Sequence, residues 1–428
     1  MRTLWFVAAL AVAGFVFATV VLLWPAPPLP TVRAAPASVA QIAQGRYVAT
    51  AADCVACHTV PGGRAFAGGR AFRLPFGTIY SPNITPDLQH GIGGWTDAQF
   101  IRAVKSGVGP HGEELYPAFP YTSYHRMSDA DALAVKAYLF SLPPEATPRR
   151  ANTLSFPFNE RQLMRFWKLL FMPRHGFVAD PRQSAQWNRG AYLVTAEAHC
   201  GECHTPRNLM YGLDNSHALA GATIQGWTAW NITSDPHHGL GGRSPDAVVA
   251  YLRYGYAPGI GAAAGPMKEA IDDSLSQLST ADLQAIALYL ASVRAQASGP
   301  VEGATPRYVT ASSPAWASAG DPHANMLGRR VFEGACAGCH AWNGQGQDTP
   351  LADLAGLPSV NQPAAVNVIQ TVLHGNSVSA PQGRAAMPAF GAGYSDAEIA
   401  AVSNYVVGRF GGQTGSARPR DVAKARLQ

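Results

Sequence analysis

Three copies of the pentapeptide Cys-x-x-Cys-His account for all 6 cysteines of this 428-residue chain. They are Cys54, Cys57 and His58; Cys200, Cys203 and His204; and Cys336, Cys339 and His340. In this motif two thiols one helical turn apart form thioethers to a porphyrin, and the imidazole becomes an axial ligand of its iron. One isolated motif would also suit a redox dithiol or half a zinc site, but three that each continue into histidine do not. The sequence therefore predicts three covalently bound haem c groups.

The opposite face of each iron needs a second ligand in an electron carrier, and a methionine thioether there raises the reduction potential. Met267 and Met387 each lie between a motif histidine and the helix expected to end that copy. In the first copy Met127 is the expected ligand, and His125 is the alternative. The predicted iron ligands are His58, Met127, His204, Met267, His340 and Met387.

The surroundings of the motifs also repeat. Each motif follows a short amphipathic segment that contains a glycine, and precedes a helix that opens with a capping serine and carries a tyrosine ten residues later. The glycines are Gly45, Gly190 and Gly328, the serines are Ser128, Ser279 and Ser395, and the tyrosines are Tyr138, Tyr289 and Tyr405. This pattern predicts that the first and last helices of each copy cross closely where glycine meets tyrosine.

Two loops are expected to support the haem histidines. The segments Asn83–Asp87 and Asn231–Asp235 follow the first two motifs at matching positions, and each contains Asn-x-Thr. We interpret them as loops braced by asparagine side chains rather than as glycosylation sites. A backbone carbonyl usually orients the second ring N–H of a ligating histidine. Pro61 and Pro206, just after two of the motifs, are expected to turn such a carbonyl towards the ring.

The N-terminus is a strong candidate for membrane insertion. Leu4–Trp24 carries no charge over 21 residues, which corresponds to ~31 Å of helix, enough for the hydrocarbon layer of a bilayer. A proline-rich spacer follows it. We expect a retained signal anchor rather than a cleaved signal peptide. Either one exports the remainder of the chain. The basic tail Gln413–Gln428 supplies +3 of the net charge of +5, so the rest of the chain is close to neutral and gives no support for nucleic-acid binding.

The residues around the motifs resemble the three-haem cytochrome subunit of bacterial membrane-bound dehydrogenases. The matching segments are Asp53–Thr59, Pro75–Tyr80, Leu115–Tyr121, Arg189–Val194, His199–Arg207 and Gly265–Met267. The resemblance extends over nearly all of residues 41–411. Many relatives look as though they carry a cleavable signal, whereas this chain looks anchored.

The resemblance implies a noncatalytic subunit that passes electrons from a large catalytic subunit to ubiquinone. That partner would carry pyrroloquinoline quinone, flavin or molybdopterin, and the resemblance leaves room for a small third subunit. The implied location is the bacterial inner (cytoplasmic) membrane, with the haem domains on the periplasmic side. The resemblance also supports the three methionines as iron ligands, and implies no catalytic residue in this chain.

The predicted fold is mainly α, with three tandem cytochrome c-like helical haem domains behind an N-terminal transmembrane or signal helix. The predicted divisions are 1–30 for the anchor or signal with its spacer, 36–145 for the first haem domain, 146–185 for an apolar connector, 186–298 for the second haem domain, 299–321 for a linker, 322–412 for the third haem domain and 413–428 for a basic tail.

Two other functions compete with the electron-transfer subunit. A self-contained multihaem enzyme, such as a peroxidase or reductase, would need one iron with an open position, and the first copy is where that position is expected. A shuttle that meets several partners transiently is the other candidate. Carbon monoxide binding to reduced haem distinguishes the first alternative, and co-purification of a large subunit argues against the second.

Overall fold

The computed structural model describes residues 36–297 and 325–427, together with residues 5, 6, 16, 19–21, 27 and 29. The predicted linker 299–321 and most of the predicted anchor Leu4–Trp24 lie outside the described residues. Within the described part of the chain, no helix has both the length and the apolar character needed to cross a bilayer.

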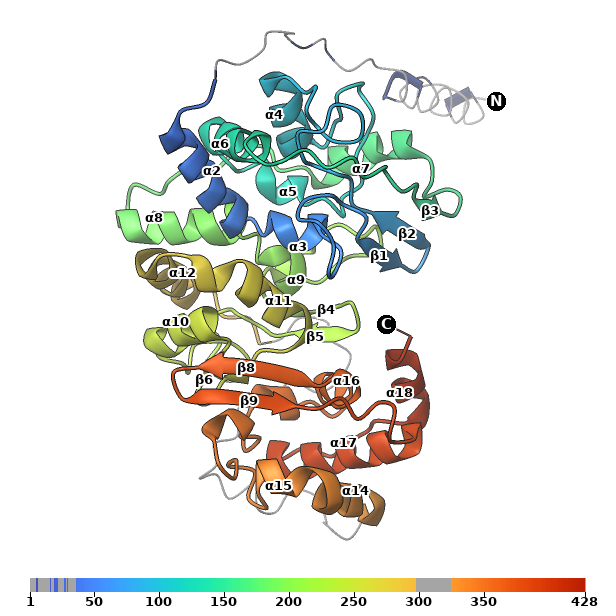
Figure 1. Ribbon diagram of the computed structural model, residues 1–428, viewed down its shortest axis with the longest axis vertical. Coiled ribbons are helices and arrows are strands. Elements are labelled where there is room, and N and C mark those ends of the chain that lie inside the picture. The colour runs from blue at the N-terminus through green and yellow to red at the C-terminus, as the bar shows by residue number, and fades with distance from the viewer. Residues whose placement is uncertain are drawn as a thin grey trace. The chain divides into compact units, whose positions relative to one another are not determined.

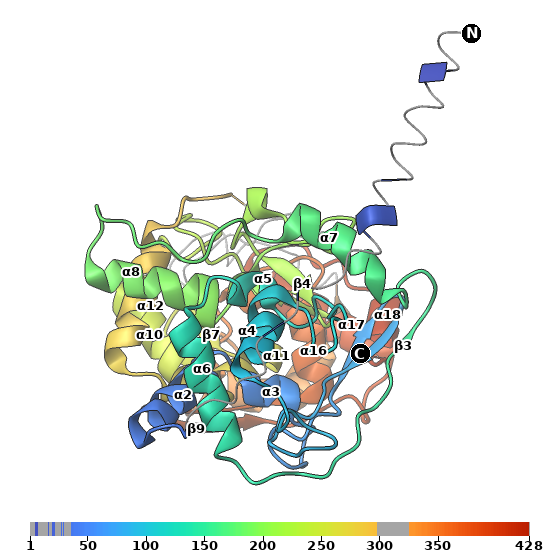
Figure 2. The same ribbon diagram turned by 90° about the horizontal axis from the view of Figure 1, so that it is seen from above.

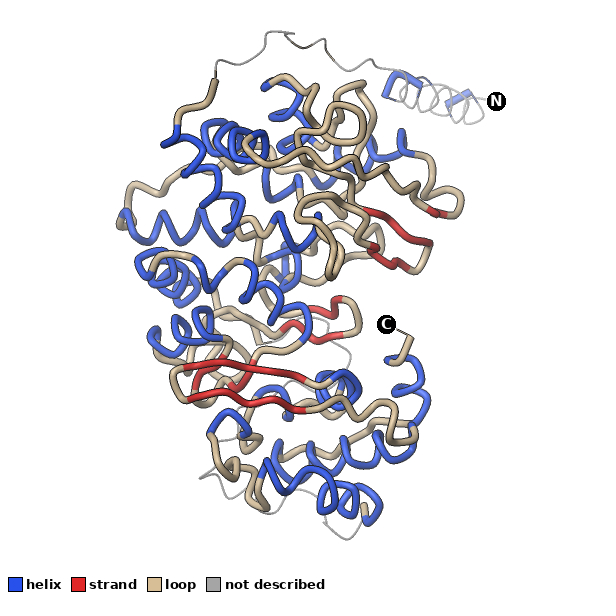
Figure 3. Tube along the Cα trace, in the orientation of Figure 1, coloured by secondary structure: helices blue, strands red, loops and turns tan. Residues whose placement is uncertain are grey.

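The chain folds as two compact units, Met1–Ala179 with Thr195–His199, and Asp180–Val194 with Cys200–Gln428. The first unit holds the first copy of the repeated pattern, and the second unit holds the second and third copies. Helices are the main element of both units, and the strands are short (Figure 3).

The first unit combines helices with a small antiparallel sheet of order β1-β2-β3. Its helices are α2 (Val39–Ala51), α3 (Cys54–His58), α4 (Asp97–Ser106), α5 (Tyr121–Tyr124), α6 (Asp129–Phe140) and α7 (Met164–Phe171). Its strands are β1 (Ala71–Leu74), β2 (Gly77–Tyr80) and β3 (Thr153–Leu154), with Ala71 paired to Tyr80 and Gly77 to Leu154.

The second unit combines helices with three two-stranded antiparallel hairpins. Its helices are α8 (Ala185–Tyr192), α9 (Gly201–His204), α10 (Pro245–Tyr254), α11 (Gly265–Asp273), α12 (Thr280–Ser292), α14 (Met326–Val331), α15 (Ala337–His340), α16 (Val366–His374), α17 (Asp396–Gly411) and α18 (Pro419–Ala425). Its hairpins are β4 (Ala222–Ile224) with β5 (Trp227–Ala229), β6 (Tyr256–Ala257) with β7 (Gly261–Ala262), and β8 (Asn376–Ala380) with β9 (Gly383–Met387).

In all three copies the first and last helices cross at the predicted glycine. A Cβ atom on Gly45 would lie 1.7 Å from the carbonyl oxygen of Ala134 and 3.0 Å from the Cβ of Tyr138. The nearest carbonyl oxygen would be 2.0 Å away at Gly190 and 2.1 Å away at Gly328. Figures 1 and 2 show α2 alongside α6 and α8 alongside α12, and α14 packs on α17 in the same way. Because any larger residue would force these helices apart, the close crossing at glycine is confirmed in all three copies. The predicted tyrosine lies beside the glycine in the first two copies, whereas a side-chain atom of Asn325 takes that place at Gly328.

The predicted serine caps are also present. The side chains of Ser128, Ser279 and Ser395 each accept a hydrogen bond from the backbone N–H three residues later. The cap at Ser395 is a complete capping box, because the side chain of Glu398 accepts a hydrogen bond from the backbone N–H of the serine. These caps start α6, α12 and α17, the helices that cover the glycine crossings.

The apolar connector, residues 146–185, contains one packed helix, α7. In α7, Trp167 is 6% exposed, and its ring lies edge-on to Tyr121 with 6.1 Å between centroids. The buried carboxylate of Glu114 accepts from Arg165 at 3.0 Å and from Lys168 at 2.5 Å. The inner face of α7 is therefore fixed to the first unit by one aromatic side chain and two ion pairs.

Candidate haem-binding sites

The three motifs lie on short helices that bring their side chains to one side. The first motif forms α3, the second ends α9, and the third begins at the end of a π-helical turn, Phe332–Cys336, and continues in α15. Burial raises the pKa of the Cys54 and Cys200 thiols to about 12 and that of Cys336 to about 11. The neutral thiol form is therefore favoured in these apolar surroundings, which suits thioether links to a porphyrin better than thiolate coordination of a cation.

Each motif histidine donates its Nδ1–H to a backbone carbonyl. The pairs are His58 with Pro82 at 2.7 Å, His204 with Trp230 at 2.6 Å, and His340 with Ala352 at 2.7 Å. Burial lowers the pKa of all three imidazoles, and the carbonyl contact opposes that shift. A neutral imidazole fixed through Nδ1 leaves its Nε2 lone pair available to a metal, the state that a haem ligand requires. The residues present therefore fit haem c at all three motifs.

The source of these carbonyls differs from the sequence prediction. Pro61 and Pro206, just after the first two motifs, were expected to turn a nearby carbonyl towards the ring, but the carbonyls come from Pro82 and Trp230, 24 and 26 residues beyond the histidine. Thr59 and Thr205 instead lead into loops whose backbone N–H groups bond to their hydroxyls. The third motif, which has no proline at this place, takes its carbonyl from only 12 residues away, so its arrangement differs.

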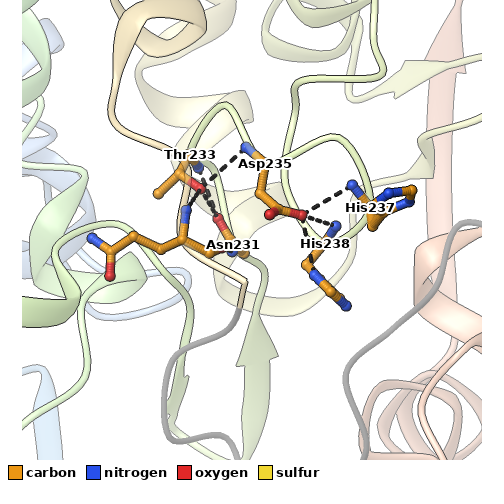
Figure 4. Close-up of polar contacts among 6 residues, drawn as sticks. Asn231, Thr233, Asp235, His237 and His238 are labelled. Atoms are coloured by element: carbon orange, nitrogen blue, oxygen red, sulfur yellow. Dashed lines mark hydrogen bonds and ion pairs between the residues drawn. The ribbon is translucent and has the colours of Figure 1, made fainter.

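The Asn-x-Thr segments position the first two carbonyls. Asn231 follows Trp230 directly, and its side-chain oxygen accepts from the backbone N–H of Thr233 at 2.8 Å and from its hydroxyl at 2.7 Å (Figure 4). The Asn231 amide donates to the carbonyl of Gln296 at 2.7 Å. Asn83 makes the same contacts with Thr85 and donates to the carbonyl of Glu145 at 2.6 Å. The predicted bracing role is thus confirmed.

Sequence reasoning did not assign the carbonyls of Pro82, Trp230 and Ala352. The signal for the first two was present in the recurrence of Asn-x-Thr after the motif. In each of these segments the carbonyl that binds the histidine belongs to the residue just before the asparagine.

The candidate methionines lie in different surroundings. Met127 is 3% exposed and belongs to the core of the first unit, against which Cys54 packs. Met387 ends β9 and packs against the core of the third copy, as Cys336 also does. Met267 is in the first turn of α11 and partly buried. These positions fit axial ligands, and the assignment remains a prediction.

Two neighbours of these methionines matter for the assignment. His125 is the alternative ligand in the first copy, and its Nδ1–H donates a hydrogen bond to the carbonyl of Lys105 at 3.0 Å. Gly265, two residues before Met267, has φ +54°, and a Cβ there would lie 2.3 Å from the ring of Trp227. The approach to Met267 is therefore closely packed.

Comparison with known proteins is consistent with this site chemistry. The cytochrome c family profile matches residues 42–143 and 326–409. The fructose dehydrogenase cytochrome subunit of Gluconobacter japonicus is 39% identical over 386 residues, which cover 86% of this chain and 79% of that protein. The gluconate 2-dehydrogenase cytochrome c subunit of Pantoea cypripedii is 37% identical, with 91% of this chain and 90% of that protein covered.

A third relative is longer. A nicotinate dehydrogenase subunit of Pseudomonas putida is 41% identical over 87% of this chain, but the match spans only 30% of that protein. The two shorter relatives are matched over most of their own length. From its motifs, its carbonyl-bound histidines and these similarities, the chain belongs to the family of cytochrome c electron-transfer subunits of dehydrogenases.

Proposed function

We propose that this chain is a three-haem subunit that relays electrons from a catalytic dehydrogenase subunit to ubiquinone at the periplasmic face of the bacterial inner membrane. The observation that carries the proposal is the recurrence of a carbonyl-bound, buried imidazole at all three motifs. Haem c bound there would supply one-electron ferric–ferrous chemistry. The proposed haem domains are residues 36–145, 186–298 and 322–412.

The chain's own residues would hold each haem from both sides. The motif cysteines attach it, the histidines ligate one face, and Met127, Met267 and Met387 ligate the other. The burial of Met127 within a packed core supports a closed position in the first copy, where an open one was the alternative. Two protein ligands on every iron favour relay over catalysis on a substrate.

The relatives support a catalytic partner. Their names describe cytochrome subunits of fructose, gluconate and alcohol dehydrogenases, the last of these designated a quinone enzyme. In the proposed complex the partner oxidises the substrate with its own cofactor, of the pyrroloquinoline quinone, flavin or molybdopterin type, and a small third subunit is a further candidate member. This chain receives the electrons.

The outer face of α7 supports membrane contact. Leu169 and Leu170 are each 63% exposed, and Phe156, earlier in the connector, is 79% exposed. On the same helix the guanidinium of Arg165 donates to the carbonyl of Val21, within the apolar N-terminal run, at 3.1 Å. An exposed apolar face on a helix that contacts Val21 suits the headgroup boundary of a bilayer.

Haem stoichiometry and ligand binding test the proposal together. The exported, detergent-extracted protein should show an intact mass with three haem additions, and its reduced form should not bind carbon monoxide. When mixed with its large subunit and substrate, it should reduce a water-soluble ubiquinone analogue. Fewer than three haems, or carbon monoxide binding to the unmodified protein, would contradict the relay.

A further inference from the structure

The second and third copies meet within one unit, and one stretch of the second copy contacts the third on two sides. This bridging segment, residues 256–267, begins at β6, turns through β7 and enters α11 at Gly265. It ends at Met267, the predicted ligand of the second haem.

The first contact reaches the histidine side of the third haem site. Tyr256 is 4% exposed, and its hydroxyl donates to the carbonyl of Pro350 at 3.0 Å. The same carbonyl accepts from the N–H of Asp353 at 3.1 Å. That N–H belongs to the peptide group whose carbonyl, on Ala352, accepts from His340 at 2.7 Å. A chain of hydrogen bonds therefore joins the tyrosine of one copy to the haem histidine of the next.

The second contact reaches the methionine side. The side-chain amide of Asn376 donates to the carbonyl of Ala263 at 2.9 Å. Asn376 is the first residue of β8, and its partner across the hairpin is Met387, the predicted ligand of the third haem. Ala263 is 3% exposed and lies four residues before Met267. The bridging segment thus contacts the β8–β9 hairpin, which carries the predicted ligand Met387, and itself ends at the predicted ligand Met267.

The packing around these contacts leaves little freedom. At Gly261 φ is +91°, and a Cβ there would lie 2.8 Å from a methyl carbon of Leu357 in the third copy. Nearby, the buried side chain of Asn367 exchanges two hydrogen bonds with the backbone of Thr228, at 2.8 and 3.0 Å. Because buried polar groups are costly when unpaired, such contacts fix the register between the two copies.

We propose that the bridging segment positions His340 and Met387, the residues that would ligate the third haem, relative to the second haem site. In this role Tyr256 positions His340 through the Pro350–Ala352 turn, and Asn376 positions Met387 through the hairpin. The inference rests on the proposed haem sites. The carbonyl that holds a ligating imidazole governs the orientation and basicity of the ring, so a displaced turn changes the potential of its haem.

Tyr256→Phe in the full-length, three-haem protein tests this role, because it removes one hydroxyl and little volume. The matched control is Tyr254→Phe, two residues earlier and 44% exposed. The readouts are a potentiometric titration of the haem absorbance and the low-temperature electron paramagnetic resonance spectrum of the ferric protein. Met387→His, which alters the predicted third ligand set, identifies the third haem's signals.

In Tyr256→Phe we expect the third haem alone to change in potential and in ferric spectrum, and the Tyr254→Phe protein to match the parent. Asn376→Ala should change the same haem, and Ser377→Ala, on the exposed side of the strand, should not. An unchanged third haem in folded Tyr256→Phe and Asn376→Ala proteins overturns the inference, as does an equal shift of all three haems. If the Tyr256→Phe protein does not accumulate, the comparison of Asn376→Ala with Ser377→Ala tests the inference without it.

The failure of this inference differs from the failure of the proposed function. If the parent carries fewer than three haems, the haem assignment is wrong and the potentials are not interpretable. Amide hydrogen exchange then still tests the contact itself, because the Asp353 N–H should exchange faster in Tyr256→Phe than in Tyr254→Phe. Three haems with no response to Tyr256→Phe or Asn376→Ala would leave the relay intact and remove only the bridging role.

Discussion

Asn83 accepts two hydrogen bonds from Thr85, from its backbone N–H at 2.8 Å and from its hydroxyl at 2.7 Å. Asn83 is 3% exposed and Thr85 is 1% exposed. The carbonyl just before Asn83, on Pro82, holds His58. A pattern that reads as a glycosylation acceptor is therefore a buried brace for a haem histidine.

The brace gives a first prediction. Asn83→Ala leaves the buried N–H and hydroxyl of Thr85 without this acceptor, and we expect a loss of ~1–3 kcal/mol in the free energy of unfolding. Denaturant titration followed by haem absorbance measures it. Asn343→Ala, at an exposed turn, is the control and should lie within ~0.5 kcal/mol of the parent. Equal stability of the Asn83→Ala and parent proteins would show that the brace does not stabilise the loop.

The sulfur of Met127 gives the second prediction. Met127→Leu keeps the side-chain volume in the core, at a cost expected below ~1.5 kcal/mol, but removes the thioether. One of the three haems should lose the methionine–iron charge-transfer absorption of its ferric form and bind carbon monoxide when reduced. Met210→Leu, at a side chain 52% exposed, should do neither.

The alternative ligand is tested in parallel. If His125→Gln opens a haem to carbon monoxide and Met127→Leu does not, then His125 is the ligand of the first copy. If neither variant binds carbon monoxide, neither residue ligates the iron.

The outer face of α7 gives the third prediction. Leu169→Asp with Leu170→Asp should leave thermal stability nearly unchanged, because both side chains are 63% exposed, but should lower the fraction of protein that sediments with liposomes. Leu209→Asp, at a fully exposed leucine elsewhere, is the control and should bind like the parent. Unchanged sedimentation of the double variant would exclude this face from membrane contact.

Trp167 does not belong to that outer face. This side chain is 6% exposed and packs against Tyr121 and Phe171. A charged residue at this position should therefore destabilise the first unit itself.

The capping box of α17 gives a pH prediction. Hydrogen bonds from Ser395 hold the pKa of Glu398 below its usual 4.5. Because the pKa is lower in the folded state, this stabilisation is present above pH ~4.5 and is lost as the pH falls through the lowered value. Glu398→Ala should therefore lower the unfolding temperature at pH 7, and the difference from the parent should shrink in acid. A difference that stays constant down to pH 3 would contradict the ionised cap.

The local features of this chain could be predicted from its sequence alone. Two thiols and an imidazole within five residues share one helical turn, so the attachment sites follow from spacing alone. Serine caps and the glycine crossings are also local in origin, because a cap needs only the next three residues and a close approach needs only a missing side chain. These features predicted the mainly helical pattern and its repetition.

The tertiary structure decided which distant groups complete each site. The carbonyls for His58 and His204 come from 24 and 26 residues away, and Tyr256 meets Pro350 across 94 residues. Any backbone carbonyl can accept a hydrogen bond, so residue type alone does not identify the one that will, although the repeated Asn-x-Thr segments lie next to two of them. Only the packing of helices, hairpins and loops brings a particular carbonyl to a particular ring.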